Sequence, residues 1–191
     1  MPSPVIVELR KKSFQFFILL IAGLYFILAY SVSRKIALLV LVFILLLFLF
    51  AEYLRLELNM QIPWMNRILK AKEERRMHSG VYFMLSTIIC LAVFDARIAV
   101  AALMMSIFGG LAAAIGGRFG KTLLFRDKSL IGSASELGVN ILFGLMLLSN
   151  AYIILAMAFT ATIAEVLVTD LEDNLFVPLF SGFLGQLIFL L

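Results

Sequence analysis

The sequence has few of the residues that soluble domains place at their surfaces or use to cross-link their folds. Charged residues make up 15% of the 191 positions and hydrophobic residues 63%, whereas soluble domains average about 25% charged and about half apolar residues. Cys90 is the only cysteine, which excludes a disulfide framework within the chain and argues against a metal–thiolate site. The composition therefore predicts an integral membrane protein with no separate soluble domain.

Long apolar runs occupy most of the chain. A membrane-spanning helix needs about 20 such residues, so we expect an all-α, polytopic bundle of about seven transmembrane helices that forms one domain over residues 1–191. The first run lacks an Ala-X-Ala-like cleavage site and is followed by others, which indicates a retained helix rather than a signal peptide. The predicted spans are 14–32, 36–52, 80–95, 98–116, 131–149, 151–169 and 175–191.

The distribution of basic residues predicts the orientation in the membrane. With the N-terminus in the cytoplasm, all but three of the 16 Lys and Arg residues fall on the cytoplasmic side, the three being Arg34, Lys35 and Arg97. Cytoplasmic loops carry such an excess of Lys and Arg, so we expect a cytoplasmic N-terminus and an external C-terminus. Because no appended domains or tails accompany the spans, we expect a prokaryotic cell membrane rather than the endoplasmic reticulum.

The longest predicted cytoplasmic connection, residues 53–79, alternates apolar and charged residues. Tyr53 and Trp64 are aromatic anchors of the kind found at membrane interfaces, and Pro63 divides the segment in two. This pattern predicts short helices lying in the interface, with Lys and Arg side chains that reach lipid headgroups or another anion. The alternative is a solvated basic loop that only fixes the topology.

Two further loops on the same side have complementary chemistry. Residues 117–138 combine cations with glycines and serines, and residues 165–178 contain a cluster of Asp and Glu. Glycine lets backbone N–H groups approach phosphate oxygens, Lys and Arg neutralise phosphate, and carboxylates hold Mg²⁺ that bridges to it. Together the loops predict a nucleotide-phosphate site. Taken separately, the charges could serve topology and the small residues helix packing.

Glu165 strengthens this prediction, because it lies near the cytoplasmic end of an otherwise apolar span. An unpaired carboxylate is costly within a membrane, so an acidic residue in that position is a candidate functional residue. The alternatives are a Glu side chain that extends to the interface or pairs with a nearby Arg.

The stretch from Ser106 to Lys121 has two parts. Gly109, Ala113 and Gly117 recur every fourth residue, which suits close helix packing within one chain or between the chains of a homo-oligomer. The glycine-rich turn that follows, residues 116–121, carries Arg and Lys and is the part in which we expect phosphate contacts.

Three motifs resemble those of the CTP-dependent lipid kinases, the family that includes dolichol kinase, phytol kinase and yeast-type diacylglycerol kinase and is distantly similar to phosphatidate cytidylyltransferases. Residues 116–121 resemble the family's G-R-x-F-G-K turn, residues 126–137 its K-S-x-x-G-S motif, and residues 164–182 its E…D-N-x-x-x-P pattern. The order and spacing of the motifs extend the resemblance over most of the chain. The matching positions are Gly116, Arg118, Gly120, Lys121, Lys128, Ser129, Gly132, Ser133, Glu165, Asp173, Asn174 and Pro178.

The resemblance implies an enzyme that transfers the γ-phosphate of CTP, assisted by Mg²⁺, to the hydroxyl of a membrane lipid alcohol of the polyprenol or dolichol type. It implies that Lys128, Glu165 and Asp173 are catalytic, with Glu165 and Asp173 holding the metal or orienting the hydroxyl. The implied partners are CTP, the lipid alcohol and the bilayer, and not nucleic acid. The implied nucleotide contacts are Gly116, Arg118, Gly120, Lys121, Lys128, Ser129, Gly132, Ser133 and Asn174, with Lys11, Lys12 and Arg55 as secondary candidates for phosphate contact.

Several positions depart from the family's pattern. Gly109 stands where the family has an acidic residue, and Ile131 replaces the usual acid of the K-S motif. Gln15 replaces a His, and Gly117 replaces the first Arg of the turn. The alternatives to a kinase are a cytidylyltransferase acting on a lipid phosphate, a divergent member that binds lipid or acts as a scaffold without catalysis, and a small transporter. Acids that could take over the missing role are Asp127, Glu136, Asp170 and Glu172.

Overall fold

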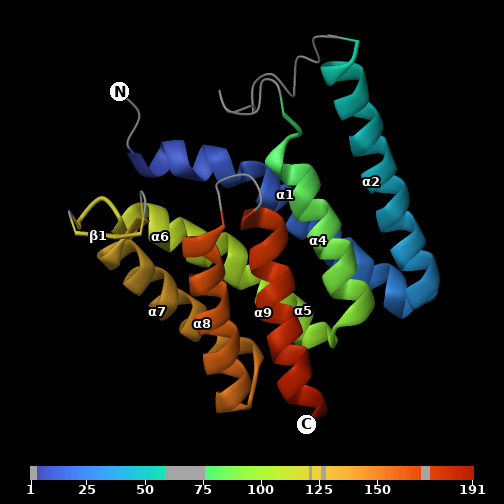
Figure 1. Ribbon diagram of the computed structural model, residues 1–191. Coiled ribbons are helices and arrows are strands. Elements are labelled where there is room, and N and C mark those ends of the chain that lie inside the picture. Colours follow the sequence, from blue (N-terminus) through green and yellow to red (C-terminus); the bar gives the residue numbers. More distant parts are fainter. Residues whose placement is uncertain (1–3, 59–75, 121, 126–127, 169–172) are drawn as a thin grey trace.

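Figure 1 shows the computed structural model, which describes residues 4–58, 76–120, 122–125, 128–168 and 173–191, with side chains from Lys12 onward. The described chain is helical except for one short antiparallel ribbon, as the apolar pattern predicts. The elements are α1 (Pro4–Ser31), α2 (Arg34–Leu56), α4 (Ser79–Val93), α5 (Ala96–Met104), η2 (Met105–Gly109), α6 (Gly110–Gly116), β1 (Leu123–Phe125), β2 (Lys128–Ser129), α7 (Leu130–Leu147), α8 (Ala151–Leu167) and α9 (Asp173–Leu190).

Each predicted span coincides with a helix or, for α5, η2 and α6, with one continuous helical stretch. Within the described residues, 5 helical stretches are long and apolar enough to cross a membrane, whereas α4 and α8 are apolar but shorter. The all-α class is confirmed, and the helices support an integral membrane protein. The long apolar stretches are Lys12–Ser31, Arg34–Leu56, Ala96–Gly116, Leu130–Leu147 and Asp173–Leu190.

The connections alternate between the two ends of the bundle. The C-termini of α2 and α8, the N-termini of α4 and α9 and the β1–β2 ribbon gather at one end, here called the ribbon end (Figure 1). The tight α1–α2, α4–α5 and α7–α8 connections lie at the other end, where Ser33, Asp95 and Asn150 each accept a hydrogen bond from a backbone N–H in the first turn of the next helix. The described helix ends that flank the loops predicted to share one side of the membrane therefore lie at one end of the bundle.

The helices differ in how much apolar surface they leave exposed. The best-buried side chains come from the middle of the bundle and include Phe83, Leu103 and Met157. The outer faces of α1 and α2 expose large apolar side chains such as Leu20 and Phe43. Exposed apolar faces of this extent suit contact with lipid rather than water.

Close packing of α6 against α7 is made by glycines. A Cβ added at Gly132 would lie 2.8 Å from the backbone oxygen of Ala113 and 3.2 Å from Cα of Gly117. Because both neighbours are backbone atoms, they cannot move aside as the end of a side chain can. The two helices can therefore approach this closely only when residue 132 lacks a side chain.

Gly132→Ala is accordingly expected to lower the free energy of unfolding by about 1–3 kcal/mol, the usual cost of overpacking. Gly138→Ala is the matched control, since it lies on the same helix with no neighbouring atom within 4 Å of the added Cβ. That control should leave stability unchanged or raise it slightly, because glycine weakens a helix interior. Thermal unfolding in detergent measures both, and an unaffected Gly132→Ala variant would contradict the packing argument.

Candidate functional site

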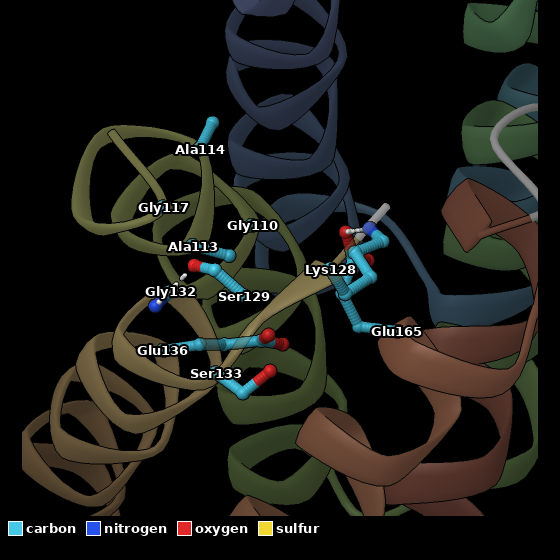
Figure 2. A pocket seen from close by; sticks show the side chains of 10 residues that line it. All are labelled: Gly110, Ala113, Ala114, Gly117, Lys128, Ser129, Gly132, Ser133, Glu136 and Glu165. Atoms are coloured by element: carbon cyan, nitrogen blue, oxygen red, sulfur yellow. Dashed lines mark hydrogen bonds and ion pairs between the residues drawn. The ribbon is translucent and has the colours of Figure 1, made fainter. Parts of the chain in front are cut away.

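A cavity of about 240 Å³ lies at the ribbon end between α6, β2, the N-terminal half of α7 and the end of α8 (Figure 2). Small residues form one wall, and polar side chains from three different elements form the rest. The wall contains Gly110, Ala113, Ala114, Gly117 and Gly132, and the polar lining contains Lys128, Ser129, Ser133, Glu136 and Glu165.

The N-terminus of α7 borders this cavity. Ser129 is the N-cap of the helix, and its Oγ accepts a hydrogen bond of 3.0 Å from the backbone N–H of Gly132. The first turn of a helix has unpaired N–H groups and a partial positive charge, both of which favour an anion. Gly117 and Gly132, which have no side chains, form the wall of the cavity at this point.

An ion pair between Lys128 and Glu165 closes the cavity on the side of α8. The Lys128 Nζ lies 2.7 Å from Oε1 of Glu165, and the two side chains are 28% and 10% exposed. Burial lowers the pKa of Lys128, but the attraction and hydrogen bond of Glu165, with help from Asp173 and Glu136, raise the pKa above its usual value. Lys128 therefore keeps its positive charge at neutral pH.

Lys12 of α1 brings a second cation to the same place. Its Nζ donates a hydrogen bond of 3.4 Å to the backbone oxygen of Ser106 in η2, and it passes close to Gly110 and Glu165. The Asp173 carboxylate, at the start of α9, interacts electrostatically with Glu165, Lys12 and Lys128. Charged groups from five elements are thus concentrated around one small cavity.

Gly110→Ala tests whether Lys12 contributes to this site. An added Cβ would lie 2.5 Å from Nζ of Lys12, which is the end of a flexible side chain and can move away at little cost to the fold. If CTP binds in this cavity, as the motif resemblance implies, its affinity should fall by about tenfold, which corresponds to one lost charge-assisted hydrogen bond. Lys12→Ala should have the same effect, and the double variant should be no worse than either single variant. Calorimetric titration with CTP measures the affinities, and additive losses would contradict the expectation.

The structure brings only some of the predicted nucleotide contacts to the cavity. Its lining includes Lys128, Ser129, Gly132 and Ser133, together with Glu165. Gly116 and Gly120 instead pack against the side chains of Ser135 and Ile131. Arg118 is exposed just beyond α6, and Lys121 lies outside the described residues.

Asn174 is buried beside the cavity without lining it. Its side-chain oxygen accepts a hydrogen bond from Nε2 of Gln15, and its backbone oxygen accepts one of 3.0 Å from the Ser86 hydroxyl. Gln15 thus has a partner of its own at the position where the resembling family has His. Asn174 joins the start of α9 to α1 and α4, and in this way it positions the neighbouring Asp173.

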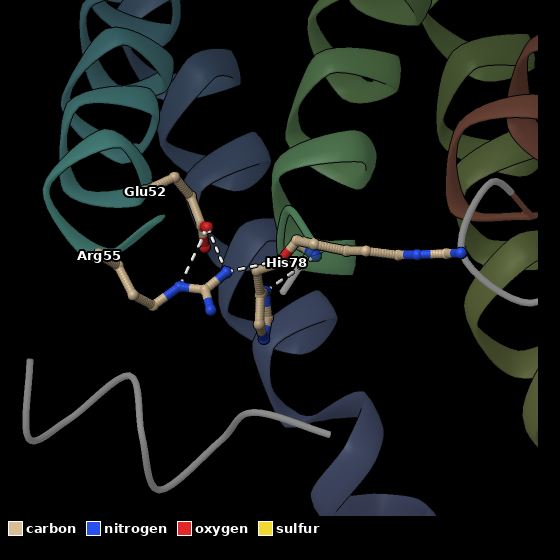
Figure 3. A network of polar contacts seen from close by, with 5 residues as sticks. Glu52, Arg55 and His78 are labelled. Carbon is tan, nitrogen blue, oxygen red and sulfur yellow. Dashed lines mark hydrogen bonds and ion pairs between the residues drawn. The ribbon is translucent and has the colours of Figure 1, made fainter. Parts of the chain in front are cut away.

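The secondary candidates are separated by the fold. Lys12 reaches the cavity, whereas the side chain of Lys11 lies outside the described residues. Arg55 belongs to a different buried network at the end of α2 (Figure 3), where its Nη2 lies 2.6 Å from Oε2 of Glu52 and donates to the backbone oxygen of Arg76. His78, the N-cap of α4, is part of the same region. This network joins the C-terminal end of α2 to the residues that precede α4.

Glu136 is the residue that the motifs did not assign to the site. It is 1% exposed, it lines the cavity, and neither carboxylate oxygen has a hydrogen-bond partner among the described residues. The sequence signal was a stripe on α7, since the buried residues Gly132, Glu136, Asn140 and Gly144 recur at every fourth position. Small and polar residues on one face of an otherwise apolar helix indicate that this face lines a polar space.

The space next to Gly109 is filled. A Cβ added at this residue would collide with the side-chain oxygen of Asn140, which is fully buried and donates from Nδ2 to the Thr162 hydroxyl at 3.2 Å. The acid that the resemblance leads one to expect at position 109 would need the volume that Asn140 occupies. Glu136 lies one helical turn before Asn140. In this chain an acidic residue near the space beside Gly109 is therefore supplied by α7.

Comparison with known proteins assigns the chain to no family. No protein-family model, curated protein or solved structure matches the chain. Function is therefore argued from the chemistry of the cavity and from the motifs.

Proposed function

We propose that this chain is an integral membrane enzyme that transfers the γ-phosphate of CTP to the hydroxyl of a membrane lipid alcohol of the polyprenol or dolichol type. The observation that carries the proposal is the cavity at the ribbon end. It combines Lys128, the N-terminus of α7 and buried carboxylates in a bundle whose outer faces are apolar. Phosphoryl transfer depends mainly on positioning and charge neutralisation, which such a site supplies.

The cationic part of the cavity suits a triphosphate. Lys128 and Lys12 neutralise phosphate oxygens, and the partial positive charge at the N-terminus of α7 favours the same anion. The backbone N–H groups of Leu130 and Gly132 already donate to the Thr122 backbone oxygen and the Ser129 hydroxyl. Lys128 is held by Glu165 at 2.7 Å. Lys128 is therefore already positioned and loses little conformational entropy when phosphate replaces part of that contact.

The carboxylates suit Mg²⁺. Oxygen ligands are those that Mg²⁺ prefers, and it is commonly held by one or two carboxylates together with substrate phosphates. Within the described residues no group of three or more His, Cys, Asp and Glu is arranged to hold a metal, so phosphate would complete the coordination of a cation at Glu165. Bound Mg²⁺ supplies neutralisation of the charge that develops on the phosphate oxygens.

We assign to Asp173 the role of binding the hydroxyl of the lipid alcohol. Its carboxylate lies beside the cavity without lining it. Asp173 orients the hydroxyl and accepts its proton while the hydroxyl oxygen forms a bond to the γ-phosphorus. The bond from that phosphorus to the β–γ bridging oxygen breaks, and CDP leaves with the bonding electrons. The products are CDP and the lipid monophosphate.

The proposal includes the orientation of the protein in the membrane. With seven spanning helices and the N-terminus in the cytoplasm, the ribbon end faces the compartment that contains CTP. The lipid alcohol reaches the site sideways from the bilayer, so its tail stays among apolar helix faces throughout. A prokaryotic cell membrane is the proposed location.

The test is a product assay with the purified protein in lipid nanodiscs. Labelled CTP is incubated with Mg²⁺ and a panel of polyprenols, phytol, diacylglycerol and the corresponding lipid phosphates. We expect CDP and a lipid monophosphate with at least one alcohol, and no turnover of ATP. Pyrophosphate release with a lipid phosphate would instead identify a cytidylyltransferase. No turnover with any acceptor, in Mg²⁺ or Mn²⁺, would contradict an enzymatic function and favour a lipid-binding role.

A further inference from the structure

Glu136 is buried, and within the part of the chain that the structure describes its carboxylate has no hydrogen-bond donor. It is 1% exposed in α7, and both Oε1 and Oε2 are without a partner there. Asn140, one helical turn further on, interacts with the carboxylate without forming a hydrogen bond of normal geometry. A buried polar group without a partner costs free energy, and an ionised carboxylate costs most. A residue in this condition is expected to have a partner that binds from outside the chain.

The side chain of Glu136 points into the cavity, toward Lys128 and Glu165 (Figure 2). Both nearby lysines already have other acceptors, since Lys128 donates to Glu165 at 2.7 Å and Lys12 donates to the Ser106 backbone oxygen at 3.4 Å. The electrostatic neighbours of Glu136 include Glu165 as well as the two lysines. Two carboxylates thus face one space, and a cation between them relieves their repulsion.

We propose that Glu136 and Glu165 together ligate a divalent cation of the Mg²⁺ class in this cavity, with Glu136 as the second carboxylate ligand in place of Asp173. The donor set consists of hard oxygen atoms on two helices, α7 and α8. Ser133, which lines the same cavity, adds a hydroxyl close to Glu136. Water or phosphate oxygens complete the coordination. The inference deepens the proposed function, because this cation is the one that accompanies the nucleotide, but the binding can be measured without turnover.

Mn²⁺ is the probe, because it prefers the same oxygen ligands and its free form is measured directly by electron paramagnetic resonance. The full chain in nanodiscs is titrated with Mn²⁺, with and without CTP. We expect Glu136→Gln and Glu165→Gln each to weaken Mn²⁺ binding at least about tenfold, since even the loss of an outer-shell partner costs 10–100-fold. Asp173→Asn should weaken it less. Glu57→Gln, an exposed acid at the ribbon end, is the control and should bind as the wild type does.

Thermal unfolding separates loss of a ligand from loss of the fold. Without metal, Glu136→Gln should unfold at the same temperature as the wild type or higher, because a neutral amide of equal size is less costly to bury. With Mn²⁺ in excess, the wild type should be stabilised by mass action and Glu136→Gln should not. A structural role for Glu136 would instead lower the unfolding temperature in both conditions.

Two results would overturn the inference. The first is unchanged Mn²⁺ affinity in Glu136→Gln, which would show that Glu136 is not a ligand of the cation. The second is a wild-type protein that binds no Mn²⁺ with or without CTP. CDP formation in either case would leave the proposed function intact with another metal ligand set. Conversely, Mn²⁺ binding that depends on Glu136 in a protein that phosphorylates no alcohol would retain the cation site and contradict the kinase.

Discussion

Lys128→Ala is expected to reduce CDP formation at least about a hundredfold, because it removes the main cation from a partly buried site where charge stabilisation is strong. Lys128 is the cavity-lining residue that combines a positive charge with a fixed position, being held 2.7 Å from Glu165. In the proposed complex, its loss also leaves the Glu165 carboxylate without its partner beside the triphosphate, and this negative charge repels the nucleotide. The initial rate of CDP release with a saturating lipid alcohol measures the effect.

Two further variants make this result specific. Lys128→Arg retains the charge in a larger, planar group and should keep part of the activity. Lys35→Ala removes an exposed cation at the opposite end of the bundle, and it should keep nearly all of the activity because a solvated charge contributes little. Activity close to that of the wild type in Lys128→Ala would remove the cavity from the catalytic mechanism.

The helices were predictable because their signal is local. A run of apolar residues long enough to span a bilayer is visible without knowledge of any tertiary contact. Polar residues then mark the ends of the helices, as Ser33 and Asn150 do by capping α2 and α8. The order of the spans also predicted which described helix ends lie together, because consecutive helices that cross the bundle alternate in direction.

Part of the site was predictable for a similar reason. The motif residues Lys128, Ser129 and Gly132 lie where a strand turns into a helix, and Glu165 lies near the end of another helix. Residues at the same end of antiparallel helices are close in space even when they are 37 positions apart, as Lys128 and Glu165 are. The sequence therefore indicated which residues meet, although it could not indicate the distance between them.

The rest of the site depends on contacts between elements. No local sequence pattern indicates that Lys12 of α1 lies close to Gly110, or that the Asn140 side chain fills the space beside Gly109. The π-helical turn η2, which ends at Gly109, shifts the register of the residues that follow it, and such turns are frequent at functional sites. Gly109→Asp is for this reason expected to disturb Asn140 rather than to increase turnover, because the space for the acid is occupied.

The glycine-rich stretch that joins α6 to β1 shows why sequence alone gave two readings of it. Gly116 and Gly120 pack against side chains of α7, whereas Gly117 lines the cavity. Packing and site formation are thus performed by neighbouring glycines of one turn. The close approach of α6 and α7 is itself what brings a helix N-terminus to the cavity, so the two roles depend on each other.

Exchanging the two charges of the Lys128–Glu165 pair separates a structural ion pair from a functional one. The single variants Lys128→Glu and Glu165→Lys each place two like charges together and should lower the unfolding temperature and abolish measurable CDP formation. The double variant restores an ion pair between the same two positions and should recover much of the stability. It should nevertheless form CDP at least about a hundredfold more slowly than the wild type, because an anion at 128 faces the triphosphate and position 165 no longer offers a carboxylate.

The buried Glu52–Arg55 pair, whose atoms are 2.6 Å apart and do not line the cavity, is the matched control. Reversing that pair should lower stability while leaving the turnover of the folded fraction within a few fold of the wild type. If the Lys128–Glu165 exchange restored turnover together with stability, the pair would be a structural contact only, and the triphosphate would have to bind elsewhere.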